Sequence, residues 1–410
     1  MPSLNSLSAS LVGLLSLGGA GVSATHPLVA STYFAGFHSD EGFPVGAMQW
    51  DMFTDAKYAF AETTQDGRLD ISGSDADQIP AFVQGAKLNG VKALVSIGGW
   101  TGSRYFSTSV GDSKNRTAFV ETCVRFAKDH NLDGLDFDWE WPNRQGLGCS
   151  EINENDTANF LKFLQELRQH PEGKNLYLTA AGSLFAWNDK SGVASKDLKG
   201  FADVLEYIMI MNYDLFGAWT PTAGPNAPLS RSCDERNVQG AADDGVEQWT
   251  AAGIPASQLV LGVPTYGRAF SVNRTAAFGD DNVLNLYPAH NATDRRQGSR
   301  WDNDPAIDVC GVAQPFGFTY PLWSMILDAG FLDHDGNPAP GMAYAWDNCS
   351  KTPAVYDPVR EIYVNYDNTA SFYEKGKYIV SKGLRGFGSY EAGGDYNNIL
   401  TNAMHVGLGL

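Results

Sequence analysis

The chain has 410 residues, of which 43% are hydrophobic and 12% aromatic, a composition that supports a large core and excludes a disordered chain. Its 29 basic and 47 acidic residues give a formal net charge of −18, which argues against nucleic acid and anionic membranes as partners. Only 19% of the residues are charged, a balance that suits a neutral ligand held by stacking and hydrogen bonds.

The first 24 residues predict a secretory signal peptide. They contain no Asp, Glu, Lys or Arg, include an apolar run from Leu11 to Val22, and end in the small-x-small sequence Val22-Ser23-Ala24. The run is diluted by Gly and Ser and is short for a membrane anchor. We therefore expect cleavage near Ala24 and a secreted, extracellular protein.

Sequons and cysteines agree with export. Asn-x-Ser/Thr sequons begin at Asn115, Asn155, Asn273, Asn291 and Asn348. The five cysteines leave at least one thiol unpaired within the chain, and Cys123, on an apolar helical face, is expected to be the buried free one. Connectivity does not follow from sequence alone; our interpretation pairs Cys149 with Cys233 and Cys310 with Cys349.

Short runs of β-branched and aromatic residues alternate with longer stretches of helical periodicity along the chain. The predicted strands are Thr32 to Phe37, Ala56 to Ala61, Lys92 to Ile97, Gly134 to Trp139, Leu176 to Ala181, Val204 to Asn212, Leu259 to Pro264 and Gly386 to Tyr390. The clearest helices are Ile79 to Asn89, Lys114 to Asn131, Asn155 to Gln169 and Ala370 to Lys382. This alternation predicts an α/β fold, the (β/α)8 TIM barrel. The alternative, an open doubly wound sheet, typically has a Gly-rich turn after the first strand, and Gly36-Phe37-His38 does not form such a turn.

The seventh and eighth strands lie about a hundred residues apart, far more than one helix needs. The intervening text is rich in aromatics, Gly, Asn and Asp, and Pro353 to Tyr366 alternates like a hairpin. We predict a small α+β insertion domain at residues 268–367, between strands 7 and 8 of a barrel formed by residues 25–267 and 368–410.

The stretch DGLDFDWEWP, from Asp133 to Pro142, carries acidic residues inside an apolar strand. Side chains alternate faces in a strand, so Asp136, Asp138 and Glu140 share the face that points into the barrel. They rise toward the C-terminal rim, where barrel enzymes keep their active sites. Three carboxyls at steps of roughly 6–7 Å cannot all ionise cheaply, so one pKa should be raised, as a general acid requires.

A barrel-filling acid or a metal site is the alternative explanation for such acids. That explanation would fit a single inward Asp, but it does not fit three acidic residues on one strand. The seven His are scattered and no HExxH is present, so we expect no metal and no cofactor. Carboxyls with aromatics, and no His or Cys partner, favour cleavage of a glycosidic bond.

The residues resemble those of family 18 glycoside hydrolases, the chitinases. DGLDFDWEWP matches the family's DxxDxDxE signature, from Asp133 to Glu140. Other landmarks of the family follow in order: SIGGW at Ser96 to Trp100, MNYD at Met211 to Asp214 and VPTYGRAF at Val263 to Phe270. The resemblance covers nearly the whole mature chain, is closest to secreted fungal chitinases, and implies a chitinase insertion domain after Arg268.

The resemblance implies a role for each matching residue. Glu140 would protonate the glycosidic oxygen while the substrate's own acetamido carbonyl attacks the anomeric carbon, a substrate-assisted route that retains configuration. Asp138 would hold the acetamido N–H, and Asp136 would share a proton with Asp138. Tyr213 would donate to the acetamido oxygen, and Asp214 would bind sugar hydroxyls.

Aromatic residues at or just after strand ends are expected to bind the sugars. These candidates are Trp100, Trp219, Tyr266 and Tyr33. Arg268 would reach polar groups of the sugar chain, and Met211 of the MNYD turn joins the predicted binding set. Trp139 faces outward and is expected to pack against helices, whereas Trp141 at the rim suits either role.

One position departs from the family pattern. The last strand of family members usually ends in a Trp that stacks under the sugar being cleaved, and Tyr390 stands there in this chain. A smaller ring offers less stacking surface, so we expect an altered or weakened central subsite at a cost of about 1 kcal/mol.

The sequence therefore predicts a chitinase that cuts β-1,4-linked N-acetylglucosamine polymers and oligomers, with no demand for an oligomer and hence an expected monomer. A chitin-binding lectin on the same barrel is a second hypothesis, although such relatives typically lack the catalytic Glu. An endo-β-N-acetylglucosaminidase is a third, and the insertion domain argues against it.

Overall fold

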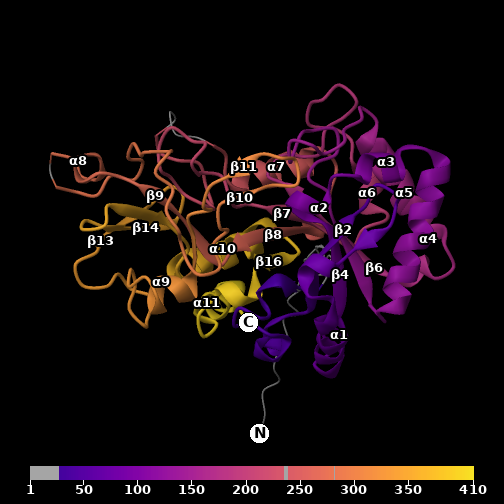
Figure 1. The fold of residues 1–410 in the computed structure, drawn as a ribbon, viewed down its shortest axis with the longest axis horizontal. Helices are drawn as coiled ribbons and strands as arrows, with labels where there is room; N and C mark the ends of the chain where they lie inside the picture. Colours follow the sequence, from indigo (N-terminus) through magenta and orange to yellow (C-terminus); the bar gives the residue numbers. More distant parts are fainter. Residues whose placement is uncertain (1–26, 235–238, 281) are drawn as a thin grey trace, which may run out of the picture.

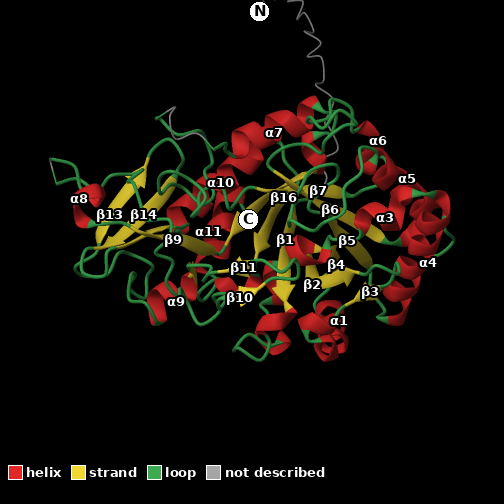
Figure 2. Ribbon diagram, turned by 45° about the horizontal axis from the view of Figure 1, so that its top comes forward, coloured by secondary structure: helices red, strands yellow, loops and turns green. Residues whose placement is uncertain are grey.

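Eight parallel strands close into a barrel in the computed structural model, which describes residues 27–234, 239–280 and 282–410 (Figures 1 and 2). In chain order they are β1 (Val29–Ala35), β2 (Asp55–Thr63), β4 (Lys92–Gly98), β5 (Gly134–Asp138), β6 (Tyr177–Ser183), β7 (Tyr207–Met211), β8 (Leu259–Pro264) and β16 (Gly386–Tyr390). They lie in the order β1-β16-β8-β7-β6-β5-β4-β2, and β2 pairs with β1 to close the ring. The predicted TIM barrel is confirmed, while the predicted signal peptide falls outside the described residues.

Helices cover the outside of the barrel and link its strands. The longer ones are α1 (Ile79–Leu88), α4 (Ser113–Asp129), α5 (Asp156–Gln169), α7 (Ala242–Ala251), α10 (Thr369–Lys382) and α11 (Ile399–Leu408). Local sequence sets their ends: α10 begins with a capping box between Asn368 and Ser371 and stops at Gly383, where φ is 64°. In the part of the chain that the structure describes, no helix combines the length and apolarity that a membrane crossing requires.

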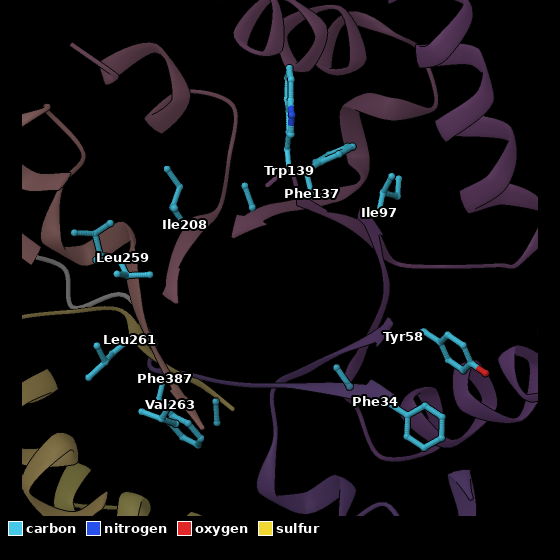
Figure 3. Close-up of a cluster of buried hydrophobic side chains, with 14 of the residues drawn as sticks. Phe34, Tyr58, Ile97, Phe137, Trp139, Ile208, Leu259, Leu261, Val263 and Phe387 are labelled. Atoms are coloured by element: carbon cyan, nitrogen blue, oxygen red, sulfur yellow. The ribbon is translucent and has the colours of Figure 1, made fainter. Parts of the chain in front are cut away.

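The main core lies between the strands and the helices. Outward-facing residues such as Phe137, Ile208 and Phe387 project from the ring of strands toward the surrounding helices (Figure 3). Trp139 follows β5 on the same face, is 1% exposed and stacks on Phe106 with 5.1 Å between ring centroids, as its predicted packing role requires. Because alternate residues of each strand fill this layer, the other half point into the barrel.

A five-stranded antiparallel sheet stands beside the barrel, between β8 and β16 in the chain (Figures 1 and 2). Its strands are β9 (Tyr266–Ser271), β12 (Thr319–Pro321), β13 (Ala343–Asp347), β14 (Thr352–Asp357) and β15 (Ile362–Asn365). β14 and β15 form the predicted hairpin, with Val355 opposite Val364. β9 begins two residues after β8 ends, so the insertion sheet starts directly at the barrel rim. A two-stranded hairpin, β10 (Ala306–Ile307) and β11 (Ala313–Gln314), projects from the same insertion.

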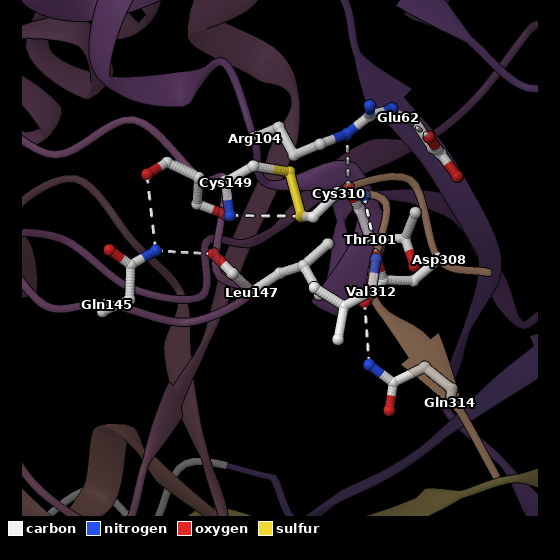
Figure 4. The surroundings of a disulfide bond; sticks show 11 residues. Glu62, Thr101, Arg104, Gln145, Leu147, Cys149, Asp308, Cys310, Val312 and Gln314 are labelled. Carbon is white, nitrogen blue, oxygen red and sulfur yellow. Dashed lines mark hydrogen bonds and ion pairs between the residues drawn. A yellow bond between two sulfur atoms is a disulfide. The ribbon is translucent and has the colours of Figure 1, made fainter.

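The predicted disulfide pairing is wrong, although Cys123 is the buried free thiol as expected. The bridges join Cys149 with Cys310 and Cys233 with Cys349, with Cα atoms 5.4 and 5.7 Å apart. Cys310 lies in the turn between β10 and β11, and the hairpin brings it to the loop after β5 (Figure 4). Pairing follows the docking of the insertion on the barrel, which sequence order does not reveal.

Candidate active site

Asp136, Asp138 and Glu140, called the acidic ladder below, lie where β5 ends at the barrel mouth. β5 carries Asp136 and Asp138 on its inward face, and Glu140 follows two residues beyond the strand. Asp136 and Asp138 are 0% and 3% exposed, whereas Glu140 is partly exposed. Glu140 is therefore the member of the ladder that a bound molecule can reach.

The segment after β4 holds the upper end of the ladder in place. The Ser103 hydroxyl accepts from the backbone N–H of Glu140 at 2.9 Å and donates to the carbonyl of Asp138 at 2.9 Å. Gly98 comes closer still, because a Cβ there would lie 2.2 Å from the same carbonyl oxygen, and its φ is 109°. Only glycine fits both the space and the backbone angle, which accounts for this glycine in SIGGW.

Asp136 is held by hydroxyl groups from the two neighbouring strands, β4 and β6, and from β1 across the barrel. Ser96 and Tyr33 donate to its Oδ2 at 2.7 and 3.1 Å, and Thr179 donates to its Oδ1 at 2.5 Å. No hydrogen bond between Asp136 and Asp138 is present in the described structure, and Asp138 Oδ1 is buried without a partner there. This donor set suits an ionised carboxylate, which only accepts, while Asp138 keeps freedom to turn.

Burial governs the protonation of the other two acids. It raises the pKa of Asp138 to about 8, with the charge of Asp136 adding to the rise and the Lys57 ammonium opposing it. Burial also raises the pKa of Glu140 well above its usual value, the charge of Asp138 adds to this, and Arg144 opposes it. Burial thus favours the protonated form of both groups, which is the form that a general acid at Glu140 requires.

The segment after β7 forms a second polar group at the mouth. Asp214 has a φ of 60°, and its Oδ1 accepts from the Tyr266 hydroxyl and from Arg268 Nε, both at 2.6 Å. Burial raises the pKa of Tyr213 well above its usual value, so the hydroxyl stays protonated and serves as a donor. Met211 ends β7 and is partly buried beside this group. The structure thus places the whole predicted MNYD turn at the mouth.

The predicted aromatic residues divide by exposure. Trp100 and Trp219 are 50% and 60% exposed and offer open ring faces, and the Arg268 guanidinium lies 5.0 Å from the Trp219 ring centroid. Tyr33 differs from the expected stacking surface: it is 1% exposed, because β1 carries it inside the barrel below the mouth. Tyr390 ends β16, partly buried, with its ring centroid 5.5 Å from that of Tyr33.

Sequence reasoning missed two cations that adjoin the ladder. Arg144 donates to Ser183 Oγ at 2.8 Å, and its guanidinium lies 4.8 Å from the Trp141 ring centroid. Lys57 is fully buried, with its ammonium 4.0 Å from Asp136 Oδ1. The sequence could have revealed Lys57, because Asp55 and Lys57 are two residues apart on a barrel strand and therefore share its inward face.

The described residues offer little to a metal ion. One group of suitable side chains is close-packed, namely Cys233, Asp347 and Cys349. Its two sulfurs are joined in a disulfide and are not thiolates that could bind an ion.

The family is decided by comparison with known sequences. A model described as glycosyl hydrolases family 18 matches residues 30–395, a range that contains every site residue from Tyr33 to Tyr390. This chain belongs to glycosyl hydrolase family 18. The family 18 match spans the barrel, the insertion sheet and both disulfides.

Individual relatives agree with the family 18 membership. Chitinase-like effectors of Moniliophthora roreri and Moniliophthora perniciosa are 44% and 40% identical over 384 and 391 residues, which is 93% and 94% of this chain and 93% and 88% of theirs. A crystal structure of a chitinase from Rhizomucor miehei is 33% identical, with a TM-score of 0.82, and the match covers 93% of this chain and 100% of that one.

Proposed function

We propose that this chain is a secreted chitinase that hydrolyses β-1,4 bonds in chitin and N-acetylglucosamine oligomers with retention of configuration. The observation that carries the proposal is Glu140, a carboxyl partly open at the mouth, directly above the buried Asp138, whose pKa is raised by burial in the direction that favours the acid form. The apolar leader sequence, the sequons and the two disulfides support secretion.

The reaction proceeds without an enzymic nucleophile. Glu140 gives its proton to the glycosidic oxygen as that oxygen leaves the anomeric carbon, and the substrate's acetamido carbonyl oxygen bonds to the same carbon from the opposite face. The resulting oxazolinium ion is positive, and Asp138 turns to accept from its N–H. Water then attacks the anomeric carbon as its bond to the acetamido oxygen breaks, and the water loses a proton to Glu140, which restores the acid and the acetamido group and leaves a β product.

The other residues at the mouth bind and orient the sugar chain. Tyr213 donates to the acetamido oxygen, and Asp214, fixed by Tyr266 and Arg268, accepts from sugar hydroxyls. Trp100 offers an open ring for stacking on a sugar face. Trp219 does the same and is also in contact with the Arg268 guanidinium.

The test is release of a fluorophore from a chitin-oligosaccharide conjugate by the secreted mature protein beside its Glu140→Gln variant. We expect turnover in the wild type and none in the variant, because the amide of Gln is far too weak an acid to protonate the glycosidic oxygen. The variant should still bind the oligosaccharide, since it retains the shape and the stacking residues of the site. Equal turnover in both proteins would remove Glu140 from the mechanism.

A second function, chitin-oligosaccharide binding without turnover, is favoured by two observations. The two Moniliophthora relatives are named chitinase-like effectors, and Tyr390 stands where the family usually has a Trp. This function predicts that the wild type binds chitooligosaccharides and releases no fluorophore. The same assay, paired with calorimetric binding, therefore separates the two functions.

A further inference from the structure

A second layer of charged side chains lies inside the barrel below the acidic ladder. β2 places Asp55 and Lys57 there, 1% and 0% exposed. Lys57 Nζ donates to Ser31 Oγ at 3.0 Å, and Ser31 donates to Asp55 Oδ1 at 2.5 Å. Tyr207 also donates to Asp55 Oδ1, at 2.9 Å. The layer is therefore a connected polar network in the barrel interior, and the catalytic scheme above does not use it.

Lys57 faces the ladder from this layer. Its ammonium is 4.0 Å from Asp136 Oδ1 and lies over the rings of Tyr33 and Tyr207, 4.7 and 5.1 Å from their centroids. Removing an ammonium from water is costly even when it is paired, and an apolar side chain of similar volume would fill the same space at no such cost. A lysine here is poorly explained by stability, which points to a role for its charge.

The titratable groups around Asp136 show which charge could favour its ionised form. They are Tyr33 from β1, Asp55 and Lys57 from β2, Asp138 from β5, Tyr177 from β6, Tyr207 from β7 and Tyr213 after β7. Lys57 is the one cation among these groups, and every other member is an acid. Its charge is therefore the one that favours a negative carboxylate in this layer.

We propose that Lys57 is a positioning residue for the acid ladder, whose buried ammonium keeps the negative charge on Asp136 so that the proton of the pair resides on Asp138. This inference rests on the proposed chitinase function and deepens it. With Asp136 charged and held by three hydroxyls, Asp138 carries the mobile proton and can rotate toward the substrate. Without Lys57, both carboxyls take up protons at mildly acidic pH, and the negative charge of the pair, which stabilises the positive intermediate above it, is lost.

The direct test is a carboxyl titration that requires no substrate. Protein labelled with 13C at the aspartate carboxyl carbon is titrated by NMR, and the signal of Asp138 is assigned with the Asp138→Asn variant. In Lys57→Met the two titration steps of the Asp136–Asp138 pair should move to higher pH by about one to three units, the size expected for losing an opposite charge at 4–6 Å. Unchanged midpoints would overturn the proposal.

Two further variants separate charge from folding. Asp55→Asn removes a negative charge from the same layer, so its midpoints should move to lower pH, opposite to those of Lys57→Met. A purely structural role predicts no such reversal of sign. If Lys57→Met does not fold, the double variant Asp55→Asn/Lys57→Met removes the buried charges together and leaves neither unpaired. Its midpoints should lie above those of Asp55→Asn, and identical midpoints would refute the role of Lys57.

Kinetics provide the functional measurement. The acidic limb of the kcat/KM profile on chitotetraose should move to higher pH in Lys57→Met by the same amount as the NMR midpoints, because the pair must carry one negative charge to act. A shift in the NMR titration with an unshifted kinetic limb would refute the link between Lys57 and catalysis. If the wild type shows no turnover, the proposed function fails, and the NMR titration still decides the position of the charge.

Discussion

Replacement of Asp138 by Asn probes the buried ladder through the pH dependence of stability. Burial raises the pKa of Asp138 to about 8 from its usual value of 3.8. The folded state therefore binds this proton more tightly than the unfolded chain does. The stability that the proton supplies is complete below the unfolded pKa and is lost as the pH rises through the folded one. The wild type should lose this stability between about pH 4 and pH 8, and Asp138→Asn should not.

The magnitude follows from the size of the shift. A rise of about 4 pH units at 1.36 kcal/mol each corresponds to about 6 kcal/mol in the free energy of unfolding. For a chain of this length the unfolding entropy is about 0.8 kcal/mol/K, so the melting temperature changes by about 7 °C. The melting temperature of Asp138→Asn minus that of the wild type should therefore be about 7 °C larger at pH 9 than at pH 4.

The assay is scanning calorimetry of the wild type and Asp138→Asn from pH 4 to pH 9, with Asp40→Asn as the control. Asp40 is exposed, so its replacement should leave the difference from the wild type constant across the range. A constant difference for Asp138→Asn as well would refute the conclusion that this carboxyl is held protonated by burial. Because the readout is stability, the result does not depend on whether the protein turns over chitin.

Three further predictions concern the central subsite, the rim and the insertion. Tyr390→Trp should tighten chitotetraose binding about fivefold, or about 1 kcal/mol, measured by calorimetry in a catalytically inactive background; unchanged affinity would show that this ring does not limit binding. Gly98→Ala should reduce kcat about a hundredfold, because the added Cβ displaces the end of β5. Gly46→Ala is the control and should be neutral, since nothing lies within 4 Å of its added Cβ. Equal kcat values in the two variants would contradict this prediction. Cys310→Ser opens a bridge with a sequence separation of 161 residues and should cost about 5 kcal/mol of stability. Cys123→Ser only places a hydroxyl in the apolar core and should cost about 1–3 kcal/mol, so equal melting temperatures for the two variants would contradict the loop argument.

Local patterns predicted the barrel and the chemistry at its mouth. Each strand was recognisable because β-branched and aromatic runs must fill a layer between strands and helices, as Phe137 and Trp139 do. The inward face of β5 was predictable for the same reason, since alternation along a strand is a property of the backbone. Asp136, Asp138 and Glu140 could therefore be assigned to one side of a strand without any tertiary information.

Contacts between distant segments were decided by the tertiary structure. The insertion brings Cys310 to Cys149, a pairing that chain order does not indicate. Tyr33 was expected to stack on sugar, but in the closed barrel it is buried and donates to Asp136. Closure of the barrel also brings the Lys57 ammonium close to the same carboxyl.

The physical reason lies in the range of the interactions. The sequence by itself determined the period of each element, the face of each strand and the acidic motif, because these depend on neighbouring residues along the backbone. The pKa of Asp138, the pairing of the cysteines and the partners of Asp136 depend on burial and on groups from other strands. Only the closed barrel with its docked insertion brings those groups within a few ångströms of one another and removes the water between them.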